Sequence, residues 1–89
     1  HALPKHLEGI VAQLRSTKGV DVAILLYENT DGSYKASLRT NGAVDVAAIC
    51  GRHGGGGHAR AAGATLHGEP EQLLHMLLSD VEEQLQAQQ

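Results

Sequence analysis

Apolar residues near the N-terminus recur at the spacing of a helix. The positions are Leu3, Leu7, Ile10, Val11 and Leu14. Residues three and four apart lie on the same face of a helix, and Pro4 suits a first helical turn. Lys18 and Gly19 provide a stop. The pattern therefore predicts an amphipathic helix over residues 4–17.

The next apolar segment, residues 20–27, is nearly unbroken and favours a strand buried on both faces. Residues 29–32, with the sequence Asn-Thr-Asp-Gly, have the composition of a turn, so a hairpin is predicted. In the strand that follows, apolar and polar residues alternate over residues 34–39. Because successive side chains of a strand point to opposite faces, Ser37 and Arg39 are expected together on its polar face.

Helix and strand signals alternate in the second half of the chain. Residues 41–42, Asn-Gly, break the second strand, and Asp45 can cap a short helix that runs toward Arg52. A short strand is predicted at residues 64–67, and a final helix opens at Pro70. Its apolar stripe consists of Leu73, Leu74, Leu77, Leu78, Val81 and Leu85.

The predicted elements follow the order helix, strand, strand, helix, strand, helix. This order predicts an α/β (α+β) fold, in which residues 1–89 form one small domain with helices packed on a mixed sheet. The strand-helix-strand connection is expected to be parallel and right-handed, as such crossovers usually are. A chain of 89 residues is long enough for a single hydrophobic core.

Composition restricts the possible functions. The chain has no Phe or Trp and only Tyr27 and Tyr34, so it has few of the aromatic platforms on which single-strand binders stack bases. Cys50 is the single cysteine and cannot form an internal disulfide, and no apolar run approaches the ~20 residues of a membrane span. A cytoplasmic protein without a membrane segment is expected.

The chain begins with His1, which indicates a piece excised from a longer protein, with residues 1–2 as a tag remnant.

Charge is distributed unevenly along the chain. The net charge of −3 argues against the coating of a long nucleic acid. From residue 35 to residue 60, however, four basic residues accompany one acid, a local charge of +3, so the other residues carry −6. The four are Lys35, Arg39, Arg52 and Arg60. A confined basic spot on an acidic body fits a small anionic ligand or a strand end.

The six histidines do not form a metal-binding pattern. They stand at positions 1, 6, 53, 58, 67 and 75, with neither a His-x3-His helix motif nor a pair of cysteines. No metal ligands are therefore predicted in this chain. His58 is expected to face a ligand or to brace a loop, and Cys50 is expected to pack within the short helix.

Four consecutive glycines, residues 54–57, followed by His58, form the most unusual segment. Glycine loses the most backbone entropy on folding, so such a run is expected where bare backbone is needed. Its amides could line a concave nest for a phosphate, and the small residues after His58 suit a short helix whose N-terminus adds positive charge. A flexible linker is the alternative interpretation, although the run lacks the Ser and polar residues that are usual in linkers.

Three segments together resemble a known family. They are Ser37-Leu38-Arg39, Val44-Asp45-Val46 and, from residue 54 to residue 63, Gly-Gly-Gly-Gly-His-Ala-Arg-Ala-Ala-Gly. The combination is similar to the DHH-associated C-terminal (DHHA) domain, type one, of the DHH phosphoesterase superfamily. Within it the chain looks most like the nanoRNases, the bifunctional oligoribonucleases and phosphoadenosine phosphate phosphatases. RecJ exonucleases and cyclic-dinucleotide phosphodiesterases are more distant. The resemblance runs from about residue 20 to the C-terminus.

The resemblance implies roles for individual residues. In that family an N-terminal lobe binds two metals, usually manganese, and activates the attacking water, while the C-terminal lobe grips the nucleotide and its phosphate. By this resemblance residues 55–57 supply close backbone contacts, His58 meets a phosphate or leaving-group oxygen, and Arg39 anchors a terminal phosphate. The implied substrate-binding residues are Ser37, Arg39, Gly55, Gly56, Gly57, His58 and Arg60.

The chain itself contains neither an Asp-His-His sequence nor an acidic cluster able to hold two metals. The fragment alone is therefore expected to bind no cofactor and to be inactive, while the parent protein is expected to be a hydrolase with two manganese ions in its N-terminal DHH domain. The expected partners are that domain and a short oligonucleotide or small nucleotide phosphate, and a homodimer of the full-length protein is compatible with the resemblance. Two alternatives stay open. One is a nucleic-acid-binding module outside a phosphoesterase, such as the related domain of alanyl-tRNA synthetases, and the other is an interaction domain whose glycine loop only turns the chain.

Overall fold

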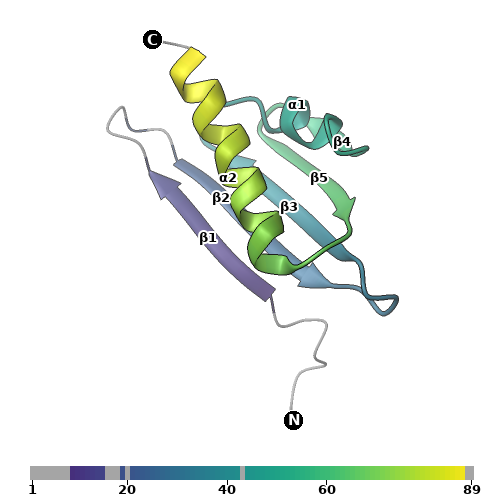
Figure 1. Cartoon of the computed structure of the whole chain (residues 1–89). Coiled ribbons are helices and arrows are strands. Elements are labelled where there is room, and N and C mark those ends of the chain that lie inside the picture. The colour runs from purple at the N-terminus through teal and green to yellow at the C-terminus, as the bar shows by residue number, and fades with distance from the viewer. Residues whose placement is uncertain (1–8, 16–18, 20, 43, 88–89) are drawn as a thin grey trace.

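A computed structural model describes residues 9–15, 19, 21–42 and 44–87. These residues form five strands and two helices (Figure 1). In chain order the elements are β1 (Gly9–Arg15), β2 (Asp21–Glu28), β3 (Tyr34–Thr40), α1 (Val46–Gly51), β4 (Gly56–His58), β5 (Ala61–Leu66) and α2 (Pro70–Ala87). The predicted α+β class and the small single sheet with packed helices are confirmed. Neither of the two described helices has the length and apolar content needed to cross a membrane.

The sheet has the strand order β1-β2-β3-β5-β4, and every neighbouring pair is antiparallel. The predicted mixed sheet with a parallel crossover is therefore wrong. The reason lies in the glycine run, which contributes a strand of its own, β4. The chain then turns back through residues 59–60, so that β5 enters the sheet between β3 and β4 and runs opposite to both.

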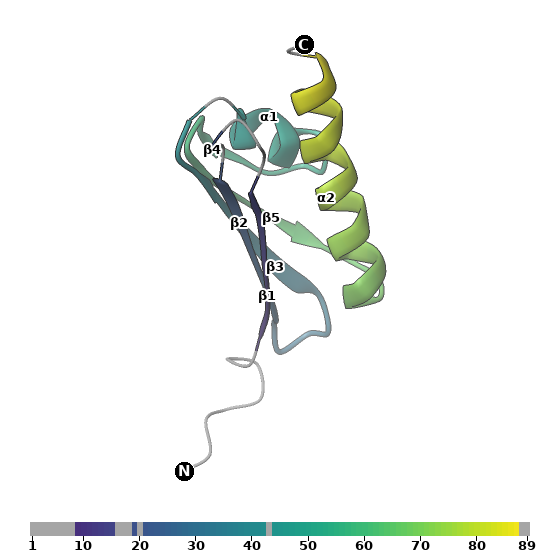
Figure 2. The same ribbon diagram turned by 90° about the vertical axis from the view of Figure 1, so that its left-hand side faces the viewer.

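Both helices cover the same face of the sheet (Figure 2). The core lies between the two layers and consists of Val22, Ile24, Leu26, Ala36, Leu38, Val44, Val46, Ile49, Cys50, Ala64, Leu66, Leu73, Leu77 and Val81. The predicted apolar stripe of α2 is confirmed, since Leu73, Leu77 and Val81 are buried and the other stripe residues pack against the core. The opposite face of the sheet carries neither described helix, and we call it the open face.

The N-terminal helix predicted over residues 4–17 is wrong over Gly9–Arg15, which form β1 and pair with β2. The rest of that prediction, residues 4–8 and 16–17, lies outside the described residues. Ala12 and Leu14 pack against the core while Gln13 is exposed. The sequence did not reveal this period of two, because a short apolar run fits the spacing of a helix and of a strand equally well. Hydrogen bonds to a neighbouring strand decide between the two.

The hairpin of β2 and β3 forms as predicted, with its turn at residues 29–32. β2 is buried on one face only, since the open face lies on its other side. At the turn, the Ser33 hydroxyl donates to Asp31 at 2.6 Å and the Ser33 amide donates at 3.0 Å. These bonds, the hydroxyl first, hold the pKa of Asp31 below its usual value. This carboxylate therefore stabilises the hairpin at neutral pH, and its contribution is lost as the pH falls through the lowered pKa.

The helix α1 has six residues, too few to persist without tertiary support. Asp45 caps it as predicted, because its Oδ1 accepts a hydrogen bond from the Ala48 amide at 3.1 Å. The backbone of Asp45 is in turn held by one side chain of α2. Gln84 accepts from the Asp45 N–H and donates to the Asp45 carbonyl, each at 2.8 Å. The start of α1 is thus fixed against α2.

Replacing Gln84 with Ala should destabilise the domain by about 1–2 kcal/mol, because two hydrogen bonds to the backbone of Asp45 are lost while helix propensity rises slightly. In a domain of this size, each kcal/mol of lost stability lowers Tm by about 4–8 °C. Thermal unfolding of Gln84→Ala should be compared with that of Gln86→Ala, an exposed position of the same helix. Equal melting temperatures for the two variants would contradict the assigned role.

Candidate functional site

The first half of the glycine run ends a helix. Gly54 has a φ of 83°, a left-handed conformation that favours glycine after a helix. The Gly54 amide donates to the Gly51 carbonyl at 3.3 Å, and the Gly55 amide donates to the Cys50 carbonyl at 2.8 Å. These two N–H groups are used within the protein. They are therefore not free to line the phosphate nest that the sequence suggested for the glycine run.

The second half of the run is a strand. Residues 56–58 form β4, and the small residues that follow form β5 instead of the predicted short helix. The predicted short helix after His58, whose N-terminus was expected to add positive charge, is therefore wrong. The physical reason is that Ala61–Leu66 pair with β3, and the first three of these residues pair with β4 as well, which a helix could not do.

The glycines differ in what a side chain would meet. A Cβ on Gly55 would overlap Ala64, 2.7 Å from its Cβ, and also the Gly63 carbonyl oxygen. A Cβ on Gly57, whose φ is 146°, would lie 2.7 Å from the Ala61 carbonyl oxygen. At Gly56 nothing lies within 4 Å. Gly55 and Gly57 are thus required by the close approach of β4 to β5, whereas Gly56 leaves free space above the sheet.

The turn between β4 and β5 is held from two directions. The carbonyl of Ala59 accepts a hydrogen bond from the Val46 amide at 2.9 Å, and the carbonyl of Arg60 accepts one from the Thr40 amide at 3.0 Å. The first bond ties the turn to the start of α1, and the second ties it to the end of β3. His58, which directly precedes the turn, is therefore carried by a fixed backbone.

The strand register brings the predicted site residues Arg39 and His58 onto one row. Ala61 of β5 is directly opposite Arg39 on one side and His58 on the other. Directly opposed residues of antiparallel strands present their side chains on the same face, so Arg39 and His58 share the open face. Two strand spacings of about 4.8 Å separate their backbones by about 10 Å. Both side chains are exposed.

The next row contains almost no side chain. It consists of Ser37, Gly63 and Gly56. On β5 and β4 the row is bare backbone, and the half-buried Ser37 stands beside it on β3, with Leu25 of β2 directly opposite Ser37 on the other side. Arg60, in the turn, is exposed at the end of these rows. Ser37, Arg39, Gly56 and His58 therefore lie on two adjacent rows of the open face, and the other predicted binding residues, Gly55, Gly57 and Arg60, adjoin these rows along the chain.

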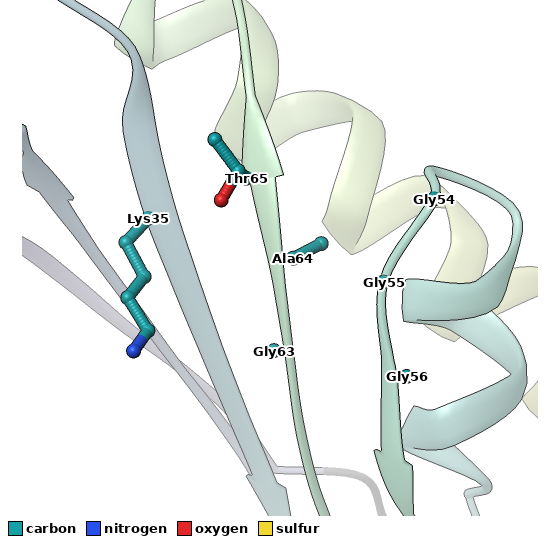
Figure 3. A pocket seen from close by; sticks show the side chains of 7 residues that line it. All are labelled: Lys35, Gly54, Gly55, Gly56, Gly63, Ala64 and Thr65. Atoms are coloured by element: carbon teal, nitrogen blue, oxygen red, sulfur yellow. The ribbon is translucent and has the colours of Figure 1, made fainter. Parts of the chain in front are cut away.

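A shallow hollow of about 360 Å³ borders these rows (Figure 3). Its lining residues are Lys35, Gly54, Gly55, Gly56, Gly63, Ala64 and Thr65. Lys35 was not among the predicted site residues. The signal that could have found it is its spacing, since Lys35 has the same parity along β3 as Ser37 and Arg39 and must share their face.

The basic residues of the central segment divide between the two faces. Arg52 contacts Asp80 at 3.0 Å and Glu83 at 2.7 Å, both on α2, and the hydrogen bond and charge of Glu83 raise its pKa. His53 Nε2 lies 2.8 Å from the second oxygen of Asp80. Arg52 is therefore not part of the predicted basic spot, because the acids of α2 neutralise its charge on the helix side.

The cations of the open face are different. Among the described residues, no carboxylate lies within ion-pair distance of Lys35, Arg39 or Arg60, while all charged side chains on α2 are acidic. These acids are Glu71, Asp80, Glu82 and Glu83. The open face is thus the side that attracts an anion, and the helix side repels one.

The part of the chain that is described contains no metal-binding site, because no three His, Cys, Asp or Glu side chains lie close enough together there to hold an ion. Cys50 is fully buried, and burial raises the pKa of its thiol. A buried thiol of raised pKa is a packing group, since the thiolate is the reactive form. The predicted packing of Cys50 in the short helix is confirmed.

Comparison with known proteins gives a family match over nearly the whole chain. A family model described as the DHHA1 domain matches residues 2–87. The bifunctional oligoribonuclease and PAP phosphatase NrnA of Thermus thermophilus is 37% identical over 79 residues, which cover 88% of this chain and 24% of that protein. Oligoribonuclease NrnB of Bacillus subtilis is 39% identical over 75 residues, which cover 76% of this chain and 18% of that protein. The chain spans a quarter or less of the length of these relatives.

The two kinds of glycine can be separated by stability measurements. Gly55→Ala should destabilise the domain by about 1–3 kcal/mol or more, the usual cost of forcing a methyl group into a closed contact. Gly56→Ala adds the same methyl group in open space and should stay within about 0.5 kcal/mol of the wild type. Urea unfolding of both variants provides the measurement. A Gly55→Ala variant as stable as Gly56→Ala would show that β4 does not approach β5 as closely as described.

Proposed function

Because the chain belongs to the DHHA1 domain family, we propose that it is the substrate-binding domain of a phosphoesterase and holds a short oligonucleotide or small nucleotide phosphate on its open face. The observation that carries the proposal is the row of Arg39, Ala61 and His58. Two side chains suited to phosphate stand about 10 Å apart on one face, with only a methyl group between them. A phosphate group can approach the sheet there and be contacted from both sides.

Each residue contributes a distinct interaction. Arg39 presents a planar guanidinium that can hold two phosphate oxygens at once, and such charge-assisted bonds are about twice as strong as neutral ones. His58 can donate a hydrogen bond to a phosphate or leaving-group oxygen. Arg60, at the neighbouring turn, adds positive charge. The row of Ser37, Gly63 and Gly56 leaves the backbone accessible, so a sugar or base can lie close to the sheet.

The catalytic part of the proposed enzyme lies outside these residues. The relatives are an oligoribonuclease with PAP phosphatase activity and an oligoribonuclease by name, and each is at least four times longer than the matched segment. We assign hydrolysis to a DHH domain in a longer parent protein, with two manganese ions to activate water there. The described residues offer no metal ligand set of their own. The cytoplasm is the compartment proposed for the parent protein, because a free thiol such as Cys50 is typical of a reducing environment.

Arg39→Ala should weaken binding of a 5′-phosphorylated dinucleotide by about 1.5–3 kcal/mol, the range for a charge-assisted hydrogen bond, without lowering Tm. The exposed side chain supports no described contact in the fold. Binding is measured by NMR titration of this chain, which detects weak affinity and reports the integrity of the fold at once. His58→Ala should weaken binding as well.

The matched control is Arg15→Ala, which removes an exposed cation at the far strand of the sheet, where Arg15 pairs with Asp21 at 2.8 Å. This variant should bind the dinucleotide as the wild type does. An unchanged affinity in Arg39→Ala, or the same loss in both variants, would refute the assignment of Arg39 to the phosphate.

The chain alone should hydrolyse neither a dinucleotide nor phosphoadenosine phosphate when manganese is added. A parent protein that includes the DHH domain should hydrolyse them under the same conditions. Product formation is followed by chromatography with both proteins side by side. Hydrolysis above background by the pure 89-residue chain would overturn the division of roles proposed here.

A further inference from the structure

We propose that Lys35 and Tyr27 form a second nucleotide subsite, which makes the domain prefer oligonucleotides over dinucleotides. This inference rests on the proposed function, because it places a further part of the same ligand. Lys35 lines the hollow beside the glycine strand, and Tyr27 is directly opposite it on β2. Neither residue is needed to bind the terminal phosphate at Arg39 and His58.

The register puts this subsite on the open face, two rows from the first. Tyr27, Lys35 and Thr65 are directly opposed across β2, β3 and β5. Lys35 is four residues from Arg39 along one strand, a separation of about 13 Å. Between the two rows lies the row of Ser37, Gly63 and Gly56, which leaves room for the ligand. In Figure 3 the Lys35 side chain lies along β3, and β5 runs between it and the glycines of the loop.

The two side chains supply complementary contacts. The ammonium group of Lys35 has no carboxylate within ion-pair distance among the described residues, so it is available to a phosphate. Tyr27 is half-buried, and its ring is one of only two aromatic groups in the chain. Proteins that hold single strands combine such a cation along the backbone with an aromatic ring on which a base stacks.

The separation of the two subsites sets a ligand length. Successive phosphates of a stacked strand rise by about 3.4 Å, so about four steps span the 13 Å between Arg39 and Lys35. A stacked pentanucleotide therefore covers the whole distance between the two cations, whereas a stacked dinucleotide that occupies Arg39 covers one of the four steps. A mononucleotide such as phosphoadenosine phosphate is confined to the first subsite for the same reason.

The charges on the open face favour a ligand that extends from Arg39 toward Lys35 over one that extends toward β1. A second hollow of about 220 Å³ lies on the other side of Arg39, toward β1. It includes Asp21, whose carboxylate is held by Arg15, and it contains no cation besides Arg39. The hollow at Lys35 has a cation and no acid in its lining. A polyanion that leaves Arg39 is therefore attracted toward Lys35.

The test compares 5′-phosphorylated pentanucleotide and dinucleotide binding by NMR titration at several salt concentrations. Lys35→Gln should raise the Kd of the pentanucleotide by about three- to tenfold and leave that of the dinucleotide within about twofold. Loss of one phosphate contact should also lower the slope of log K against log salt by about 0.7 for the pentanucleotide alone. Tyr27→Leu should weaken the pentanucleotide without changing its salt slope, because stacking carries no charge.

The control is Arg15→Gln, which removes a charge from β1 and should affect the two ligands equally. Equal losses for both ligands in Lys35→Gln, or no loss for either, would overturn the second subsite while the proposed function stands. Failure of the wild-type chain to bind either ligand would overturn the proposed function and this inference with it.

Discussion

The short helix α1 is held at both ends by α2, and the geometry of the open face depends on this clamp. Gln84 bonds the backbone at the N-terminal end, and Asp80 with Glu83 binds Arg52 and His53 at the C-terminal end. Glycines have no side chains with which to fix their own position. The placement of β4 therefore comes from its surroundings: the end of α1 receives the Gly55 amide, and the start of α1 donates to the turn at Ala59.

The two layers of the domain also separate its charges. The helix layer carries four acids on α2 and uses two of them, Asp80 and Glu83, to bind the basic residues that follow α1. In the sheet layer Arg15 pairs with Asp21, but Lys35 and Arg39 have no carboxylate within ion-pair distance among the described residues. A domain with a net charge of −3 can in this way present a surface that attracts phosphate. The net charge of the whole sequence does not reveal this surface, because it averages the acids of one layer with the cations of the other.

Sequence reasoning succeeded where local chemistry decides structure. The turn at residues 29–32, the cap at Asp45 and the stripe of α2 each follow from residue types at fixed spacing, and all three are present. It failed at Gly9–Arg15, where pairing with β2 outweighed a helical pattern. It also failed at the glycine run, because glycine permits many conformations and only the positions of α1 and β5 select one. Lys35 was missed because a strand lysine beside a binding site has the same local sequence as any solvated one.

The row of Ser37, Gly63 and Gly56 has a consequence for what the domain can distinguish. Proteins that read a base sequence do so with donor and acceptor side chains directed at the edges of the bases. This row offers the Ser37 hydroxyl, the apolar Leu25 opposite it on β2 and bare backbone on β5 and β4, and the ring of the proposed Tyr27 contact stacks on any base. A ligand held here is recognised through its phosphates and its flat surfaces. In the proposed function, the domain would therefore bind its ligand without distinguishing one base from another.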